Sequence, residues 1–146
     1  KGLFTPIEYK PAAEVVDKNY PFWLTTGRLH AHYHTCTMTR NSPSLDREIK
    51  ECFLEMNPED AAELGVTDGE WVVIESRRGA VSSKVKLTHS LNKRAVFMPF
   101  HFLESRANIL TNPIFDPIAK IPEFKVCVVK IEKMGTKSNH SSTPAN

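Results

Sequence analysis

The chain has 146 residues, of which 40% are hydrophobic and 25% charged, as expected for one globular domain with its own core. Its net charge of +2 is too small to indicate a nucleic acid polymer or an acidic membrane surface as partner, and no apolar run approaches the roughly 20 residues that cross a bilayer. The three cysteines (Cys36, Cys52 and Cys127) show neither a paired spacing nor a CxxC pattern. This favours reduced thiols and a cytoplasmic location, and it offers no iron–sulfur site.

The N-terminal half is predicted to contain two strands and two short helical segments. In chain order, the prediction is an extended lead-in over residues 1–19, a strand over 20–26, a helical turn over 45–51, a strand over 53–56 and a helix over 57–64. The helix is the most clearly marked element, because Asn57 can cap free amides, Pro58 suits the first helical position and Gly65 is a C-terminal signal. Glu59 and Asp60 face the positive end of its dipole, so capping accounts for them better than a catalytic acid pair does.

The C-terminal half is predicted to consist mainly of strands. In chain order, the prediction is strands over 70–76 and 80–87, a strand over 95–102 that ends at Pro99, a helical turn over 103–111, a long ordered loop over 112–123, a strand over 124–131 and a disordered tail over 134–146. Val81, Ser83 and Val85 alternate with lysines and serine, and a turn before them completes a hairpin. Short strands dominate, so periodicity predicts a small closed β-barrel.

The stretch of residues 25–39 carries more hydrogen-bonding groups than a core segment usually does. Gly27 follows the first predicted strand and lets the backbone turn or approach a ligand closely, since it has no β-carbon. Arg28 and a series of hydroxyls and imidazoles come next. Each of these groups, if buried, needs a partner. We therefore interpret the stretch as a ligand-lining segment.

Four potential metal ligands alternate in this stretch, namely His30, His32, His34 and Cys36. On a strand they would share one face, which suggests a zinc or copper site. Residues on one face of a strand are about 6.6 Å apart, however, which is too far for all four to reach one ion. Core or surface histidines are the favoured interpretation, and we expect no metal site here.

Three further motifs leave alternatives open. Residues 77–79 (Arg-Arg-Gly) could clamp a phosphate or form a solvated hairpin turn, and the solvated turn is favoured. His101 ends a strongly apolar strand, so it is either hydrogen-bonded inside the protein or directed at a ligand. Lys125 shows the same ambiguity. Local chemistry alone thus indicates a small β domain that binds a polar ligand such as a nucleotide.

A series of motifs, all in the same order, resembles the C-terminal cofactor domain of the dimethyl sulfoxide reductase family of molybdenum and tungsten oxidoreductases. The motifs are the residues 26–35 (TGRLHAHYHT), 37–39 (TMT), 55–61 (EMNPEDA), 64–65 (LG), 68–69 (DG), 76–79 (SRRG), 97–102 (FMPFHF), 107–111 (ANILT) and 116–127. Within the family the chain looks most like the catalytic subunit of formate dehydrogenases, with periplasmic-type nitrate reductases next. Tyr33 departs from the family pattern, where many relatives carry Trp, and Lys93-Arg94 replaces a common Pro-Gly turn.

The resemblance implies a mainly β fold, a double-psi β-barrel (aspartate decarboxylase-like) with a few short helices, over residues 20–133. It implies that this barrel binds molybdopterin guanine dinucleotide. The family pattern places the cofactor contacts on Thr26, Gly27, Arg28, Leu29, His30, Ala31, His32, Tyr33, His34, Thr35, Phe100, His101, Asn108 and Lys125.

The resemblance also implies what the chain needs from elsewhere. Molybdenum or tungsten would be carried by the cofactor and ligated from outside this segment, so no catalytic residue and no metal ligand is expected in the chain. The implied partners are upstream domains of the same subunit, including an iron–sulfur domain, and the chain alone is expected to be inactive. Two alternatives are a freestanding cofactor-binding subunit of a nitrate reductase or formylmethanofuran dehydrogenase type, and a cofactor-free barrel that binds a partner protein.

Overall fold

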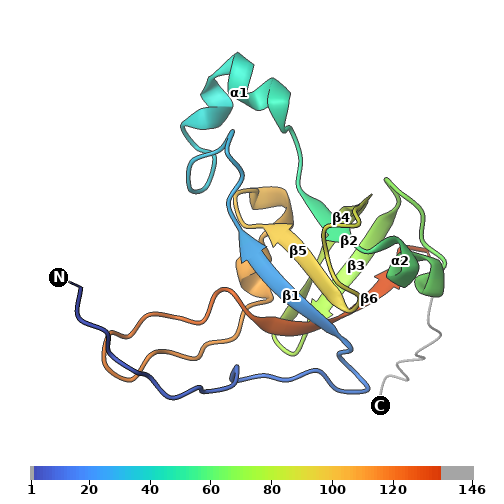
Figure 1. The fold of residues 1–146 in the computed structure, drawn as a ribbon. Coiled ribbons are helices and arrows are strands. Elements are labelled where there is room, and N and C mark those ends of the chain that lie inside the picture. The colour runs from blue at the N-terminus through green and yellow to red at the C-terminus, as the bar shows by residue number, and fades with distance from the viewer. Residues whose placement is uncertain (1, 136–146) are drawn as a thin grey trace, which may run out of the picture.

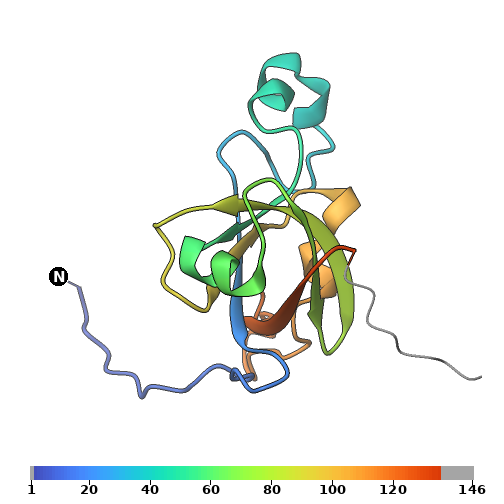
Figure 2. The same ribbon diagram turned by 90° about the vertical axis from the view of Figure 1, so that its right-hand side faces the viewer.

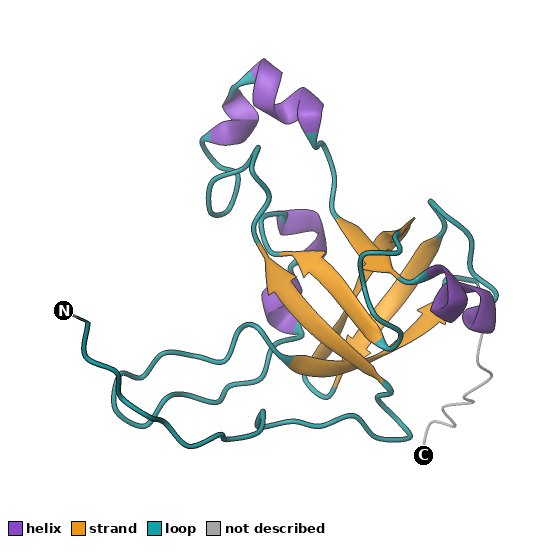
Figure 3. Ribbon diagram, viewed as in Figure 1, coloured by secondary structure: helices purple, strands orange, loops and turns teal. Residues whose placement is uncertain are grey.

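Six strands close into a barrel in the computed structural model, which describes residues 2–135 (Figure 1). The strands are β1 (Phe22–Gly27), β2 (Phe53–Met56), β3 (Trp71–Ser76), β4 (Gly79–Leu87), β5 (Ala95–Pro99) and β6 (Cys127–Lys133). The helices are α1 (Pro43–Glu48) and α2 (Pro58–Leu64), with 3-10 turns η1 (Thr39–Asn41), η2 (Leu103–Ser105) and η3 (Ala107–Ile109). Figure 3 shows that the helices lie at the periphery and the strands form the body.

The strand order around the barrel is β1-β5-β2-β4-β3-β6. Two neighbouring pairs are parallel, β1 with β5 and β2 with β4, and the other pairs are antiparallel. Parallel neighbours need crossover connections, so the chain cannot run around the barrel as a simple meander. The closed sheet with these crossovers confirms the predicted double-psi β-barrel with a few short helices.

The core fills the inside of the barrel, as the alternating pattern predicts. Val81, Ser83 and Val85 of β4 are buried, whereas Lys84 and Lys86 are not. Phe22, Leu24, Leu54, Met56 and Ile74 are each at most 1% exposed and come from three different strands. Burying a side chain of this size contributes roughly 1.5–3 kcal/mol, so packing inside the closed sheet is the main source of stability.

The two α-helices follow their local signals. The Asn57 side chain accepts a hydrogen bond from the Glu59 amide at 2.9 Å, and Gly65 ends α2 in the left-handed conformation at φ 65°. These are the predicted caps. Helix α1 begins at Pro43, two residues before the predicted turn, because proline suits the first helical turn and Ser42 precedes it in extended conformation. Figure 2 shows that α1 stands clear of the barrel.

Residues 2–21, before β1, form no helix or strand, but two carboxylates, Glu14 and Asp17, anchor them to the barrel, and Asp17 pairs with Arg77 at 2.5 Å. Glu14 accepts hydrogen bonds from Arg77, Arg78 and the Val128 amide. Burial works against ionisation of Glu14, but the hydrogen bonds from Arg78 and Val128 outweigh it and hold the pKa of this carboxyl below its ordinary value. The solvated-turn interpretation of residues 77–79 was therefore wrong for Arg78, whose side chain is only 22% exposed.

The loop after η3 is ordered, as predicted, and projects from the barrel beside the N-terminal segment (Figure 1). The Glu123 carboxylate accepts hydrogen bonds from Asn112 at 2.9 Å and from the Ala13 amide at 3.3 Å, which joins the two segments. Beyond Gly135 the predicted tail lies outside the described residues. Over residues 2–135, none of the helices combines the length and the apolar character needed to cross a bilayer.

Candidate ligand-binding site

Three segments leave the barrel at the same edge. Strands β1 and β5 run parallel with Gly27 opposite Pro99, so both end at this edge. Strand β6 runs antiparallel to β1 with Cys127 opposite Leu24, so the residues just before β6 approach from the same side. Residues far apart in the sequence are therefore brought together by the strand register alone.

A cavity of about 590 Å³ opens between these segments. It is lined by Thr26, Arg28, His34, Thr35, Phe100, Asn108, Phe124 and Lys125. Seven of these eight residues were predicted as ligand contacts from the sequence. Phe124 was missed because the family pattern placed no contact on it; like Lys125, it was assigned to the last strand, which in fact begins at Cys127. The available signal was its aromatic ring directly before Lys125.

Hydrogen bonds between β1 and the segment before β6 hold one wall of the cavity. The Thr26 hydroxyl donates to the Phe124 carbonyl at 2.6 Å, and the Lys125 ammonium donates to the Thr26 carbonyl at 2.9 Å. These bonds replace a strand ladder, which explains why β6 begins three residues later than predicted. Lys125 Nζ lies 5.9 Å from the centre of the Phe100 ring. An ammonium has three donors, so two remain for a ligand.

His101 was interpreted either as hydrogen-bonded inside the protein or as directed at a ligand, and in the structure both of its ring nitrogens bond inside the protein. Its Nε2 accepts a hydrogen bond from the Leu29 amide at 2.8 Å, so Nδ1 carries the proton and donates to the His34 carbonyl. Burial lowers the pKa of this imidazole, which is only 1% exposed, and favours the neutral form that these bonds require. His101 thus fixes both ends of the 29–34 loop, and it lines only a smaller cavity that adjoins the first.

Gly27 is needed for packing at the end of β1. A β-carbon at this position would lie 2.4 Å from Cε2 of Phe97, so either the ring or the strand would have to shift. Close approach of Phe97 therefore gives this glycine a packing role of its own.

The remaining predicted contacts of the 26–35 stretch lie outside the 590 Å³ cavity. Leu29 packs against the core, and Ala31 is buried. His30 pairs with Glu48 at 2.5 Å, and Tyr33 is 62% exposed, edge-on to His34.

His32 is also held away from the cavity. It is buried and bonds Thr39 Oγ1 at 3.0 Å and the Ile49 carbonyl at 2.6 Å. The stretch is a loop in which His34 and Cys36 have positive φ, so the alternating residues do not share one face. Within residues 2–135, no three His, Cys, Asp or Glu side chains come close enough to hold one metal ion.

The hairpin turn between β3 and β4 positions Asn108. Arg78 donates to the Leu110 carbonyl at 3.0 Å and 2.7 Å, and Gly79 leaves room for Ile109, whose Cγ2 would lie 2.6 Å from a β-carbon there. The turn therefore clamps the segment that carries Asn108. Residues 77–79 support the cavity without lining it, which neither sequence interpretation foresaw.

All three cysteines are buried, free thiols. Burial raises the pKa of the Cys36 thiol, that of Cys52 to about 12 and that of Cys127 to about 11. Because the thiolate is the form that reacts and binds metals, these cysteines are inert structural residues.

Comparisons with known proteins show which family the chain resembles. A protein-family profile described as Molydopterin dinucleotide binding domain matches residues 22–128. The alpha subunit of an F420-dependent formate dehydrogenase from Methanocaldococcus jannaschii is 51% identical over 134 residues, which is 92% of this chain and 20% of the relative. The alpha subunit of F420-dependent formate dehydrogenase 2 from Methanococcus maripaludis is 50% identical over 133 residues, or 91% of this chain and 20% of the relative.

The fold has a counterpart among solved structures. Acetylene hydratase from Pelobacter acetylenicus superposes with a TM-score of 0.68 at 18% identity, over 80% of this chain and 19% of that chain. The chain thus spans about one fifth of the length of the curated relatives it matches. The profile covers most of the chain, including the whole barrel up to the start of β6. The chain therefore belongs to the molybdopterin dinucleotide binding domain family.

Proposed function

We propose that the chain binds molybdopterin guanine dinucleotide as the C-terminal domain of a molybdenum- or tungsten-dependent oxidoreductase, and that the parent enzyme is a formate dehydrogenase. The observation that carries the proposal is the 590 Å³ cavity, in which seven side chains assigned to the cofactor from sequence come together from three segments. The two formate dehydrogenase alpha subunits, identical to this chain at half of the aligned positions, support the choice of parent enzyme.

The chemistry of the cavity fits such a cofactor. Arg28 and Lys125 supply positive charge for phosphate or ring oxygens, and Asn108 supplies an amide that both donates and accepts. Phe100 and Phe124 offer aromatic faces for a planar heterocycle. When bound, the cofactor supplies the redox-active metal, and the chain supplies binding and orientation.

Each side chain has a distinct part in this proposal. Lys125 is held by the Thr26 carbonyl and directs its remaining donors into the cavity. Arg28 is exposed at the rim and approaches the ligand as a planar fork. Thr35 and His34 close the far side on a loop that His101 fixes. The wall is thus fixed by main-chain contacts before a ligand arrives, which lowers the entropy cost of binding.

The proposal also assigns the parts of the chain and its surroundings. We propose a lead-in over 1–19, a cofactor-binding barrel over 20–133 and a tail over 134–146. Upstream domains of the same subunit, including an iron–sulfur domain, would complete the enzyme, in line with the one-fifth coverage of the relatives. The unpaired cysteines support a cytoplasmic location.

The test is cofactor occupancy of the full-length parent enzyme at limiting cofactor. Arg28→Ala and Lys125→Ala should each weaken binding about ten- to hundredfold, because a hydrogen bond to a charged group is lost. Occupancy is measured from the fluorescence of the oxidised pterin released by heating, and does not depend on turnover. Lys10→Ala, an exposed lysine outside the cavity, is the matched control. Wild-type occupancy in both variants would refute the site, and no pterin in wild-type protein would favour the cofactor-free barrel.

A further inference from the structure

Two smaller cavities continue from the 590 Å³ cavity along the surface. The first, of about 160 Å³, shares Thr35, Phe100 and Asn108 with it. The second, of about 320 Å³, shares Leu103 and Arg106 with the first. The three cavities therefore adjoin one another, from the end of β1 to strands β3 and β4.

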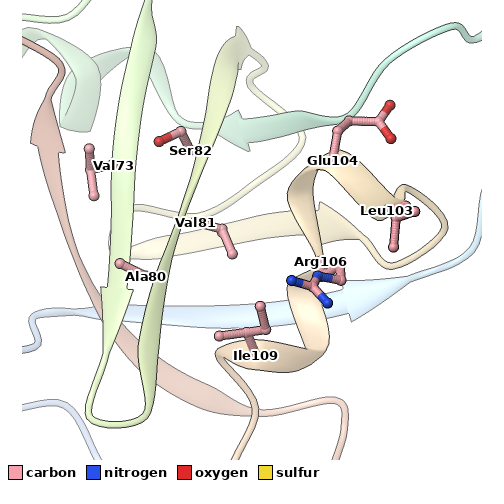
Figure 4. A pocket seen from close by; sticks show the side chains of 8 residues that line it. All are labelled: Val73, Ala80, Val81, Ser82, Leu103, Glu104, Arg106 and Ile109. Carbon is pink, nitrogen blue, oxygen red and sulfur yellow. The ribbon is translucent and has the colours of Figure 1, made fainter.

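Arg106 lies at the junction of the two outer cavities and lines both. Figure 4 shows its guanidinium extending from the segment between η2 and η3 toward Val81 and Ile109. Except for Glu104 and Arg106, the walls here are apolar or uncharged, with Val73, Ala80, Val81, Ser82, Leu103 and Ile109. A single cation thus stands between surfaces that would contact carbon atoms of a ligand.

The guanidinium of Arg106 has no bonded partner among the residues that the structure describes. Among residues 2–135, no hydrogen bond or ion pair involves its guanidinium. Glu104, the carboxylate in the same cavity, is paired with Arg40 at 2.5 Å. Arg40 in turn packs over the Phe102 ring at 5.2 Å, so the Glu104 carboxylate is already engaged by a cation that is itself held in place. A guanidinium with free donors in a groove is suited to bidentate contact with phosphate oxygens.

We propose that the cofactor groove extends past Asn108 to Arg106, and that Arg106 binds the phosphate oxygens of the dinucleotide. This inference rests on the proposed function and adds a contact that the sequence motifs did not indicate. The largest cavity then takes the pterin, and the phosphates lie where the two outer cavities meet.

The experiment titrates the isotope-labelled chain with guanosine 5′-diphosphate and follows amide signals by NMR. We expect shifts at residues 103–109, and Arg106→Ala should weaken the affinity about ten- to hundredfold while Arg106→Lys retains part of it. Guanosine, which lacks phosphate, should bind the wild-type chain and the Arg106→Ala variant alike. Arg47→Ala is the matched control, since Arg47 lies on α1 outside all three cavities.

The outcomes separate this inference from the proposed function. Equal affinity of wild type and Arg106→Ala, or no shift at residues 103–109, would overturn the role of Arg106. In the parent enzyme, reduced cofactor occupancy with Arg28→Ala but not with Arg106→Ala would overturn this inference alone. Unchanged occupancy with every one of these variants would overturn the proposed function as well. Arg106 is exposed and has no bonded partner in the described chain, so its variants should fold, and thermal unfolding checks this.

Discussion

One buried imidazole connects the barrel to the loop that carries much of the candidate site. The two ring nitrogens of His101 hold the Leu29 amide and the His34 carbonyl, which lie at opposite ends of the loop. Only neutral imidazole can accept at one nitrogen and donate at the other, and burial lowers the pKa of His101 accordingly. The position of His34 and Thr35 in the cavity thus depends on His101 being neutral, with its proton on Nδ1 and none on Nε2.

This arrangement predicts a pH-dependent stability. The pKa of His101 is lower in the folded state than in the unfolded state, so its contribution is complete above the unfolded pKa of about 6.5 and is lost as the pH falls through the folded pKa. Replacing it with alanine should cost about 2–4 kcal/mol at pH 7.5, since a buried side chain and two hydrogen bonds are lost. Urea unfolding at pH 7.5 and pH 5 measures both effects.

The control for His101 is His89→Ala, because His89 is an exposed histidine. In His101→Ala, the free energy of unfolding should decrease less between pH 7.5 and pH 5 than it does in the wild type. In His89→Ala, this decrease should be the same as in the wild type. An equally steep loss in the His101 variant would mean that another group titrates.

The sequence identified the lining side chains better than it identified the shape of their loop. Arg28, Asn108 and Lys125, which line the cavity, were identified because the family pattern places cofactor contacts on them. His30 and His32 were assigned to the ligand but bond elsewhere, because the loop turns through left-handed residues at positions 34 and 36. Neither of these is glycine, so the residue types at positions 34 and 36 did not predict the turn.

At the scale of elements, the β3–β4 hairpin turn supports the segment η3. Arg78 reaches the Leu110 carbonyl from one side and Glu14 from the other, so it ties the lead-in, the hairpin and the cavity wall together. Gly79 allows Ile109 to rest on the turn. These contacts join residues 32 and 64 positions apart, and hydrophobic periodicity reports only on neighbours. Helix α2, whose cap signals are local, was by contrast predicted correctly.

The fit of Ile109 on Gly79 can be tested by a pair of substitutions. Gly79→Ala should destabilise the chain by about 1–3 kcal/mol, as overpacking does, because the new methyl group would meet Ile109. It should also weaken binding of the cofactor through displacement of Asn108. Adding Ile109→Ala removes the clashing atom and should restore part of the lost stability, so the two changes are not additive.

Gly2→Ala is the control for this pair, since a β-carbon at Gly2 would meet no atom within 4 Å. Thermal unfolding and cofactor occupancy of the four proteins complete the cycle. Additive effects of the Gly79 and Ile109 substitutions would contradict the clamp.

At the scale of the whole molecule, the chain has a hydrophobic core of its own but supplies only one side of the candidate site. The closed barrel buries its own apolar side chains, so we expect the isolated chain to fold and to unfold cooperatively. The cavity lies at one edge of the barrel and is lined from this side only by side chains that bind and orient. None of the chain's three cysteines, all buried, lines this cavity.

Because the chain lines the cavity from one side only, we predict that the isolated chain neither oxidises formate nor reduces nitrate with any artificial dye. This should hold even when the chain is supplied with metal-loaded cofactor. The relatives are about five times as long, and orientation of a reactive metal needs support from the whole site. Rejoined to its upstream domains, the same segment should become necessary for turnover, with Arg28→Ala lowering the rate at limiting cofactor. The full-length enzyme carried through the same reconstitution is the positive control. Dye-linked formate oxidation by the purified chain, rising in proportion to its concentration, would show that the catalytic site is already complete within these 146 residues.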